Sequence, residues 1–295
     1  MHRVAERIAE LRAARAAAQA RLDSGTLPAF PAASRELRAT EWRVNPGVPP
    51  DGEPVRIELS DLPRAARSAS YFDIRGLHSR DEARLFADLF AARDDPVRAN
   101  VTVDSLHAAF ALDEIVYELR DCIVALRWHR EAYLLSFICA LHRHAQFTLP
   151  DRSELAIGAP FLRALGKHAR RIGERRNVRV EGFPAPPVDS HNPVDAGDLL
   201  QIHKGRITAD GVRENLQTAL QYHAGGDVDE ASGELALAQL WQWVHHATGV
   251  LDEGRKVDIA LLEELLEHDA SGSRAAGKLL RAAAAATPPC PEALP

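Results

Sequence analysis

The chain has 295 residues, a hydrophobic fraction of 46%, a charged fraction of 26% and a formal net charge of −6. These values are typical of a folded globular protein and exclude wholesale disorder. Basic and acidic residues are interspersed, so the charge does not indicate a nucleic-acid-binding surface. No apolar run reaches the roughly 18 residues that a membrane span needs. We therefore expect neither a nucleic-acid partner nor a membrane partner.

The cysteines and the N-terminal segment bear on the compartment. Cys122, Cys139 and Cys290 are too few and too scattered for a disulfide framework or a zinc finger, which is typical of a reducing cytosol. Residues 1–22 are rich in Ala, Arg and Glu and have no apolar centre, so they do not form a secretory signal. We expect a cytoplasmic protein.

The chain begins with a helical segment and two linkers. Residues 2–22 predict a helix, because apolar side chains recur at helical spacing until an Asp-Ser-Gly sequence ends the pattern. Residues 27–31 and 44–53 are rich in Pro and Gly and predict linkers. We interpret residues 1–45 as an N-terminal helical clasp with its linker.

A strand is predicted at residues 55–59, and from residue 70 onwards strands alternate with helices. Short β-favouring runs predict strands at residues 55–59, 71–74, 99–104, 122–126 and 178–182. Amphipathic or apolar patterns predict helices at residues 80–92, 112–119, 133–142 and 161–175. Residues 63–68 connect the first two strands. Strands separated by helices imply right-handed crossovers and a parallel sheet or barrel, which we place at residues 46–205.

The last third of the chain predicts helices only. A proline-rich loop at residues 184–200 precedes it. Helical patterns follow at residues 209–223, 234–248 and 258–267, then an Ala-rich stretch at 275–286 and a Pro-rich tail that we expect to fray. We expect a C-terminal all-helical domain at residues 206–295.

Several segments resemble malate synthases of the shorter, A-type class. Residues 71–86 (YFDIRGLHSRDEARLF) are similar to the family's YFYLPKLESHLEARLW, and residues 104–121 (DSLHAAFALDEIVYELRD) to ETLPAAFQMDEILYELRD. Residues 207–216 (ITADGVRENL), 238–246 (AQLWQWVHH) and 252–257 (DEGRKV) resemble ITEAGLRNNI, SQIWQWIHH and DDGRKV. The segments keep their order, and the resemblance covers most of residues 35–260.

The resemblance implies an activity. Malate synthases condense acetyl-CoA with glyoxylate: an aspartate takes a proton from the acetyl methyl group, and an arginine stabilises the enolate. A Mg²⁺ ion held by a glutamate and an aspartate polarises the glyoxylate. The methyl proton is weakly acidic, so its removal needs a positioned base and a compensated enolate oxygen. Mg²⁺ prefers oxygen ligands, which carboxylates supply.

The family's base and metal ligands are carried over unevenly. The base falls on Asp229, because residues 229–236 (DEASGELA) match the family's DAATAEIS. The metal-binding glutamate falls on Asp104, and the metal-binding aspartate on Ala132, which cannot ligate a metal. The adjacent Glu131 is a possible substitute only if the backbone departs from regular structure, since consecutive side chains diverge. Asp229 and Asp104 are equally consistent with helix capping.

Two further elements of the family site are altered. His129 stands where the family has a glycine whose backbone faces the glyoxylate carboxylate, and its side chain obstructs that approach. The strand that carries the catalytic arginine, with family motif RPRGWHL, has no counterpart. Arg75 and Arg127 are possible substitutes, and the sequence does not decide between them.

These observations define the expected fold and two functions. Residues 46–205 leave about 160 residues for a barrel, short of the roughly 200 that the smallest complete (β/α)8 barrels use. We expect an α/β fold with an incomplete or reduced TIM-type barrel of four or five strands. Its open side would be covered by terminal helices, a second copy or a partner protein. The protein is then either a malate-synthase-type acyltransferase or a catalytically degenerate homologue that acts as a ligand-binding or protein-interaction scaffold.

Overall fold

The computed structural model describes residues 2–45, 47–62, 69–155, 159–184, 192–267 and 274–290. Five strands form its sheet: β1 (Val55–Ile57), β2 (Tyr71–Ile74), β3 (Arg98–Val103), β4 (Ile123–Trp128) and β5 (Arg179–Glu181). Around the sheet and at the N-terminus lie α1 (His2–Asp23), α2 (Arg35–Ala39), α4 (Arg80–Ala91), α5 (Leu106–Phe110), α6 (Leu112–Glu118), α7 (Arg130–Ala140) and α8 (Pro160–Arg176). The C-terminal helices are α9 (Ala209–Ala224), α10 (Glu230–His245), α11 (Ile259–Glu267) and α12 (Arg274–Ala283).

The sheet is parallel throughout and its strands follow chain order, β1-β2-β3-β4-β5. Helices connect β2 to β3, β3 to β4 and β4 to β5, so this part of the chain repeats the strand–helix unit of a (β/α) barrel. In the described part of the chain the sheet does not close, because β1 and β5 each pair on one side only. The expected α/β fold with an incomplete barrel is confirmed.

One face of the sheet is apolar along a complete row. The register aligns Ile57, Ile74, Val101, Leu126 and Val180 across all five strands. The first four are fully buried. An unbroken row of branched side chains demands a cover, and the crossover helices supply it.

Two contacts show which helices cover this face. Phe72 of β2 stacks on Phe90 of α4 with ring centroids 5.2 Å apart. On α8, a Cβ added at Gly173 would lie 2.4 Å from Val180 Cγ2, so the helix approaches β5 closely only because the residue is glycine. The helices therefore lie on the apolar face, as on the outside of a barrel.

The opposite face of the sheet is polar. In register, one row consists of Arg56, Asp73, Asn100, Ala125 and Arg179. The next row towards the strand ends contains Thr102, Arg127 and Glu181 in register, with Glu58 and Arg75 two residues beyond Arg56 and Asp73. Because side chains alternate along a strand, these residues point away from α4 and α8.

The N-terminal helix fastens onto the start of α4. Arg15 of α1 donates from Nε to Glu82 Oε1 at 2.7 Å and from Nη2 to Glu82 Oε2 at 2.8 Å, and both side chains are buried. The same Nη2 also donates to the carbonyl of Gly76, which follows β2. The helix predicted at residues 2–22 thus forms, and it contacts the loop after the second strand.

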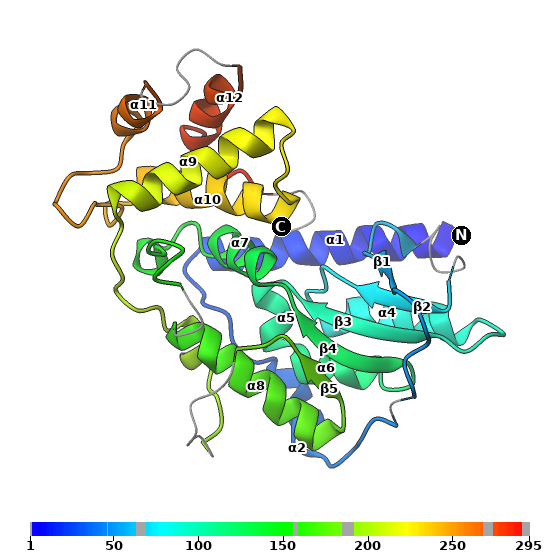
Figure 1. Ribbon diagram of the computed structural model, residues 1–295. Helices are drawn as coiled ribbons and strands as arrows, with labels where there is room; N and C mark the ends of the chain where they lie inside the picture. The colour runs from blue at the N-terminus through cyan, green and yellow to red at the C-terminus, as the bar shows by residue number, and fades with distance from the viewer. Residues whose placement is uncertain are drawn as a thin grey trace.

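The C-terminal helices have a core of their own and dock through α10. A second cluster of buried apolar residues runs from Ile207 to Ala283. Gln242 accepts a hydrogen bond from Leu149 N, and Trp243 donates to Leu149 O, which ties α10 to the segment after α7. Figure 1 shows α9 to α12 stacked above the α/β part. None of the described helices combines the length and the apolar character that crossing a bilayer requires.

A disulfide joins Cys139, near the end of α7, to Cys290 near the C-terminus. The two cysteines are 151 residues apart, and their proximity results from the fold alone. We did not expect this bond from the spacing of the three cysteines. Cys122 is free and buried.

The predicted elements agree with the structure, with local differences. The helix expected at 133–142 begins three residues earlier, at Arg130, because His129 caps it. The helix expected at 234–248 begins at Glu230, because Asp229 caps it. The short helices α2 and α5 were not predicted. Residues 63–68 of the connector, 185–191 of the loop and 291–295 of the tail lie outside the described residues.

Candidate active site

Charged residues gather where the parallel strands end. Glu58 follows β1, Arg75 follows β2, Asp104 follows β3 and His129 follows β4, while Asp229 is supplied by the start of α10. All parallel strands end at the same edge of a sheet, so the topology brings the first four together. Catalytic residues of barrel enzymes occupy this edge.

Asp104 is buried directly after β3. Both carboxylate oxygens accept the backbone N–H of Gly76, at 3.1 and 3.0 Å. Gly76 has φ +63°, and this left-handed turn aims its N–H at the carboxylate. Burial raises the pKa of Asp104 to about 7, although the Gly76 N–H and the charge of Arg75 oppose the rise.

His129 is the N-cap of α7. Its Nδ1 accepts a hydrogen bond from Ala132 N at 3.3 Å, so Nε2 carries the proton of the neutral ring. Burial lowers the pKa of His129, and the nearby charge of Arg75 lowers it further, while Glu131 and Asp229 act in the opposite direction. Near neutral pH the imidazole of His129 is therefore uncharged, and the carboxylates that act on it are those of Glu131 and Asp229.

Asp229 is the N-cap of α10. Its Oδ1 accepts the backbone N–H of Ser232 at 3.0 Å, and hydrogen bonding from Ser232 lowers the pKa of Asp229. Its carboxylate also forms a side-chain hydrogen bond with Ser232, and Asp229 is exposed. Asp229 therefore caps a helix, as one of the two sequence interpretations predicts, and its ionised carboxylate acts on the pKa of His129; its role as a base stays a prediction.

The start of α10 overhangs the open end of the sheet. The charge of Glu230 and that of Asp104 both act on Arg56, which forms an ion pair with Glu58 on the polar face. The charge of Asp229 in turn acts on the pKa of His129, the residue that follows β4. The start of α10 therefore lies near enough to the strand ends for its charges to act on residues there. We call this site the barrel mouth: Arg56, Glu58, Arg75, Asp104, His129 and Asp229.

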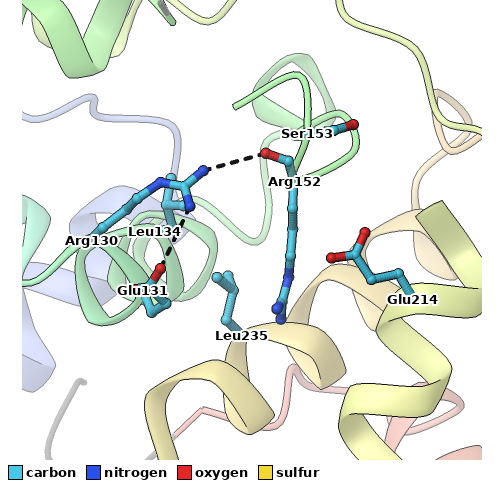
Figure 2. Close-up of a pocket in the computed structure, with 7 residues that line it drawn as sticks. All are labelled: Arg130, Glu131, Leu134, Arg152, Ser153, Glu214 and Leu235. Carbon is cyan, nitrogen blue, oxygen red and sulfur yellow. Dashed lines mark hydrogen bonds and ion pairs between the residues drawn. The ribbon is translucent and has the colours of Figure 1, made fainter. Parts of the chain in front are cut away.

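A cavity of about 270 Å³ lies between α7 and the C-terminal helices. Figure 2 shows Arg152 running between the α7 side, with Glu131, and Glu214 of α9. Arg152 donates to Gln239 Oε1 at 3.3 Å and to Ser232 O at 2.8 Å, so it also touches the first turn of α10. Burial lowers the pKa of Arg152, opposed first by Glu214 and then by Glu131.

The residues expected to hold Mg²⁺ do not fit the ion. Glu131 forms ion pairs with Arg130 at 3.5 Å and lines the cavity of Figure 2, while the charges that act on Asp104 are those of Arg75, Glu58 and Asp73. Ala132 offers no ligand. Within the described ranges, no three His, Cys, Asp or Glu side chains could hold a metal ion together.

Sequence reasoning missed Arg56, Glu58, Asp73 and Arg152. The signal for the first three is present: charged residues at i and i+2 near the end of a predicted parallel strand share one face and meet at the mouth. Asp73 accepts from Thr102 at 2.6 Å and from Arg75 Nε at 2.8 Å, so it orients Arg75. Arg152 lies in an irregular segment, and its sequence carries no such signal.

The relationship to known proteins agrees with this geometry. Residues 60–188 match the family model described as malate synthase, TIM barrel domain. Malate synthase of Myxococcus xanthus is 27% identical to the chain, over 73% of the chain and 56% of the relative. The bifunctional glyoxylate cycle protein of Caenorhabditis elegans is 28% identical over 68% of the chain and 29% of the relative. Malate synthase A of Escherichia coli is 25% identical over 68% and 52%.

The chain spans about half the length of the malate synthases that it matches. The match to the family model begins after β1 and includes β2 to β5. Arg75, Asp104 and His129 directly follow β2, β3 and β4. A parallel (β/α) sheet in chain order and the sequence similarity lead to one conclusion. The chain is similar to the malate synthases over about 70% of its length, residues 60–188 match the model of their TIM-barrel domain, and a shortened homologue fits these findings.

Proposed function

We propose that this protein is a malate-synthase-like acyltransferase that condenses acetyl-CoA, or a related acyl-CoA, with glyoxylate or another small 2-oxo acid. The observation that carries the proposal is Asp229, an exposed and ionised carboxylate at the start of α10 whose charge acts on His129 of the barrel mouth. The homology with malate synthases supports the same chemistry. The acetyl-CoA and glyoxylate assignments rest on that homology.

Asp229 acts as the base in this proposal. It accepts a proton from the acyl methyl group, and the C–H electron pair moves onto the thioester to give an enolate. The enolate carbon then bonds to the carbonyl carbon of the 2-oxo acid, whose oxygen is protonated, and water hydrolyses the thioester to release CoA. A positioned base typically contributes 10²–10⁴-fold to such a step.

Arg75 is the better candidate for the arginine that stabilises the enolate. Its charge acts on both Asp104 and His129, so it lies within the mouth, and Asp73 fixes its Nε. Arg127 instead pairs with Glu181 at 3.1 Å on the polar face. A guanidinium in a partly dry site can compensate an enolate oxygen.

Mg²⁺ has no part in the proposed steps. The family's ion would need Asp104 together with a second carboxylate, and Ala132, which stands at the position of that second ligand, contributes nothing. We expect any turnover to be unchanged by EDTA.

The proposal is tested by CoA release from acetyl-CoA and glyoxylate in the presence of EDTA. We expect Asp229→Asn to lower the rate at least ~100-fold, because it removes the base but keeps the cap. Asp227→Asn, in the same exposed loop, is the matched control and should retain the wild-type rate. Arg75→Gln should lower the rate and Arg127→Gln should not. Equal rates for Asp229→Asn and wild type would refute the role of Asp229.

The second candidate is a catalytically degenerate homologue that binds a ligand or partner without this chemistry. Ala132 at a metal-ligand position favours it. Absence of CoA release together with a rise in Tm on adding glyoxylate would support this candidate and refute the first. The exposed large apolar side chains in the described chain are Leu27, Val48 and Val55, which lie outside the polar face. The described residues of the polar face therefore suit a ligand better than an apolar protein partner.

Assembly and location are part of the proposal as well. The open edges of the sheet, β1 and β5, offer unpaired backbone groups that a second copy or a partner protein would cover. Light scattering on the purified protein gives the oligomeric state. We propose a cytoplasmic location, and the Cys139–Cys290 disulfide, which is uncommon in a reducing compartment, bears on this proposal. Counting free thiols in protein isolated from the cytosol under alkylating conditions tests this point.

A further inference from the structure

The Cys139–Cys290 disulfide joins the two apolar cores of the molecule. Cys139 is buried in the main core, and Cys290 packs against that same core. A short distance earlier in the chain, Ala283 ends α12 and belongs to the second core, that of the C-terminal helices. Residues 284–290, which we call the tail segment, therefore run from the second core back to α7 and are bonded to it covalently.

The hydrogen bonds of the tail segment are made with the helical part and within the segment itself. Ala285 O accepts from Trp241 Nε1 of α10 at 2.8 Å, and Ala285 N donates to Ala282 O of α12. Cys290 N donates to Pro288 O. In the described part of the chain none of these bonds reaches α7, so the disulfide and the packing of Cys290 hold the tail segment there.

The two cysteines differ in their access to solvent. Cys139 is buried, whereas Cys290 is half-buried and lies in a segment that contains no helix or strand. Thiol–disulfide exchange begins when a thiolate reaches one of the two sulfurs, so access decides which of them is attacked. Cys290 is therefore the side at which a small thiol can open the bond.

Reduction from this side is a balanced exchange with a small thiol such as glutathione. The glutathione thiolate bonds to Cys290 Sγ, and the S–S bond breaks with its electron pair on Cys139 Sγ, which takes up a proton. A second glutathione thiolate attacks the mixed disulfide and releases Cys290 as a thiol. Two electrons pass to the protein, and glutathione leaves as its disulfide.

Other contacts keep the two parts of the molecule docked when the bond is open. α7 packs against α10 directly, and α10 is tied to the segment after α7 by the hydrogen bonds of Leu149 with Gln242 and Trp243. These contacts do not involve the tail segment. Reduction therefore frees the tail segment and leaves the fold in place.

We propose that Cys139–Cys290 is a reversible redox latch. In the oxidised protein it fixes the tail segment on α7 and joins the two cores. In the reduced protein the tail segment leaves α7 and uncovers Cys139. Disulfides of cytosolic proteins are usually transient and act in redox sensing or catalysis, so this role agrees with the proposed cytoplasmic location.

Thiol mapping by mass spectrometry on the folded full chain tests the latch. After treatment with glutathione disulfide we expect a linked Cys139–Cys290 peptide pair. After treatment with millimolar reduced glutathione we expect iodoacetamide to alkylate both cysteines, while the buried Cys122 stays unmodified as the internal control. Absence of the linked pair, a bond that glutathione leaves intact, or a Cys139 that stays protected after reduction would overturn the proposal.

Thermal unfolding measures what the latch contributes to stability. The bond joins residues that are 151 positions apart, so reduction should lower the Tm of the wild type by at least about 5 °C. Cys290→Ser should have the lower Tm without reductant and should not respond to it. Cys122→Ala keeps the pair and should lose as much Tm on reduction as the wild type does.

A wild-type Tm that reduction leaves unchanged would show that the bond does not join the two cores, and would overturn the proposal. A Cys290→Ser protein that still responds to reductant would overturn it as well. The comparison of oxidised and reduced wild type remains decisive if either variant fails to fold.

Discussion

The two faces of the five-stranded sheet differ in the kind of side chain they carry. The row Ile57–Ile74–Val101–Leu126–Val180 packs under helices, while the opposite face carries charged pairs such as Asp73–Arg75 and Arg127–Glu181. A complete barrel fills its interior with bulky branched residues. The face that would line that interior is polar here, and its central side chains Asp73, Asn100 and Thr102 are buried polar groups that lead to the mouth.

The apolar face should carry most of the stability. Phe72→Ala removes a fully buried ring stacked on Phe90 and should lower the free energy of unfolding by about 3–5 kcal/mol. Urea unfolding monitored by circular dichroism measures the loss. A loss under about 1 kcal/mol would mean that the apolar face is not the core, and the contrast between the faces would disappear.

The mouth should make stability depend on pH. The pKa of Asp104 is raised to about 7 by burial, so folding favours the protonated carboxyl. Its contribution to stability is present below about pH 4 and is lost as pH rises through about 7, on the order of 4 kcal/mol in total. Relative to Asp104→Asn, the wild type should therefore be more stable at pH 4 than at pH 8.

Urea titrations of both proteins at several pH values test this dependence. Asp121→Asn, at an exposed loop residue, serves as the control and should follow the wild-type curve. A wild-type curve parallel to that of Asp104→Asn would show that Asp104 titrates as it does in the unfolded chain.

Within the polar face, Asp73, next to the barrel mouth, should contribute more to the free energy of unfolding than the Arg127–Glu181 pair near the β5 edge of the sheet. Asp73→Ala leaves the Thr102 hydroxyl and Arg75 Nε without their partner in a buried setting, which should cost about 1–3 kcal/mol. Asp73→Asn keeps an acceptor and should cost less. Identical unfolding midpoints for Asp73→Ala and wild type would contradict the buried network.

The edge of the polar face should contribute least. Arg127 and Glu181 are each more than a third exposed, so Arg127→Ala should change the free energy of unfolding by less than about 1 kcal/mol. Thermal unfolding at low and high salt measures this. A larger loss that salt does not reduce would indicate that the edge is covered by another chain.

The fold was predictable because its pattern is local. The strand at residues 71–74 and the helix at 2–23 follow from periodicity and end signals, and five parallel strands follow from the alternation with helices. The positions of Asp104 and Asp229 came from matched motifs. The pairing of Cys139 with Cys290 and the direction of Glu131 depend on tertiary contacts between distant segments, which no local pattern encodes.

The most direct test of the account is exchange of solvent deuterium into the methyl group of acetyl-CoA, followed by NMR in D₂O with EDTA and without a 2-oxo acid. This reaction requires only the base and the site that stabilises the enolate. The account predicts exchange by the wild type and by Asp227→Asn, and a loss of at least ~100-fold in Asp229→Asn. Exchange that is absent in the wild type, or unchanged in Asp229→Asn, would contradict it.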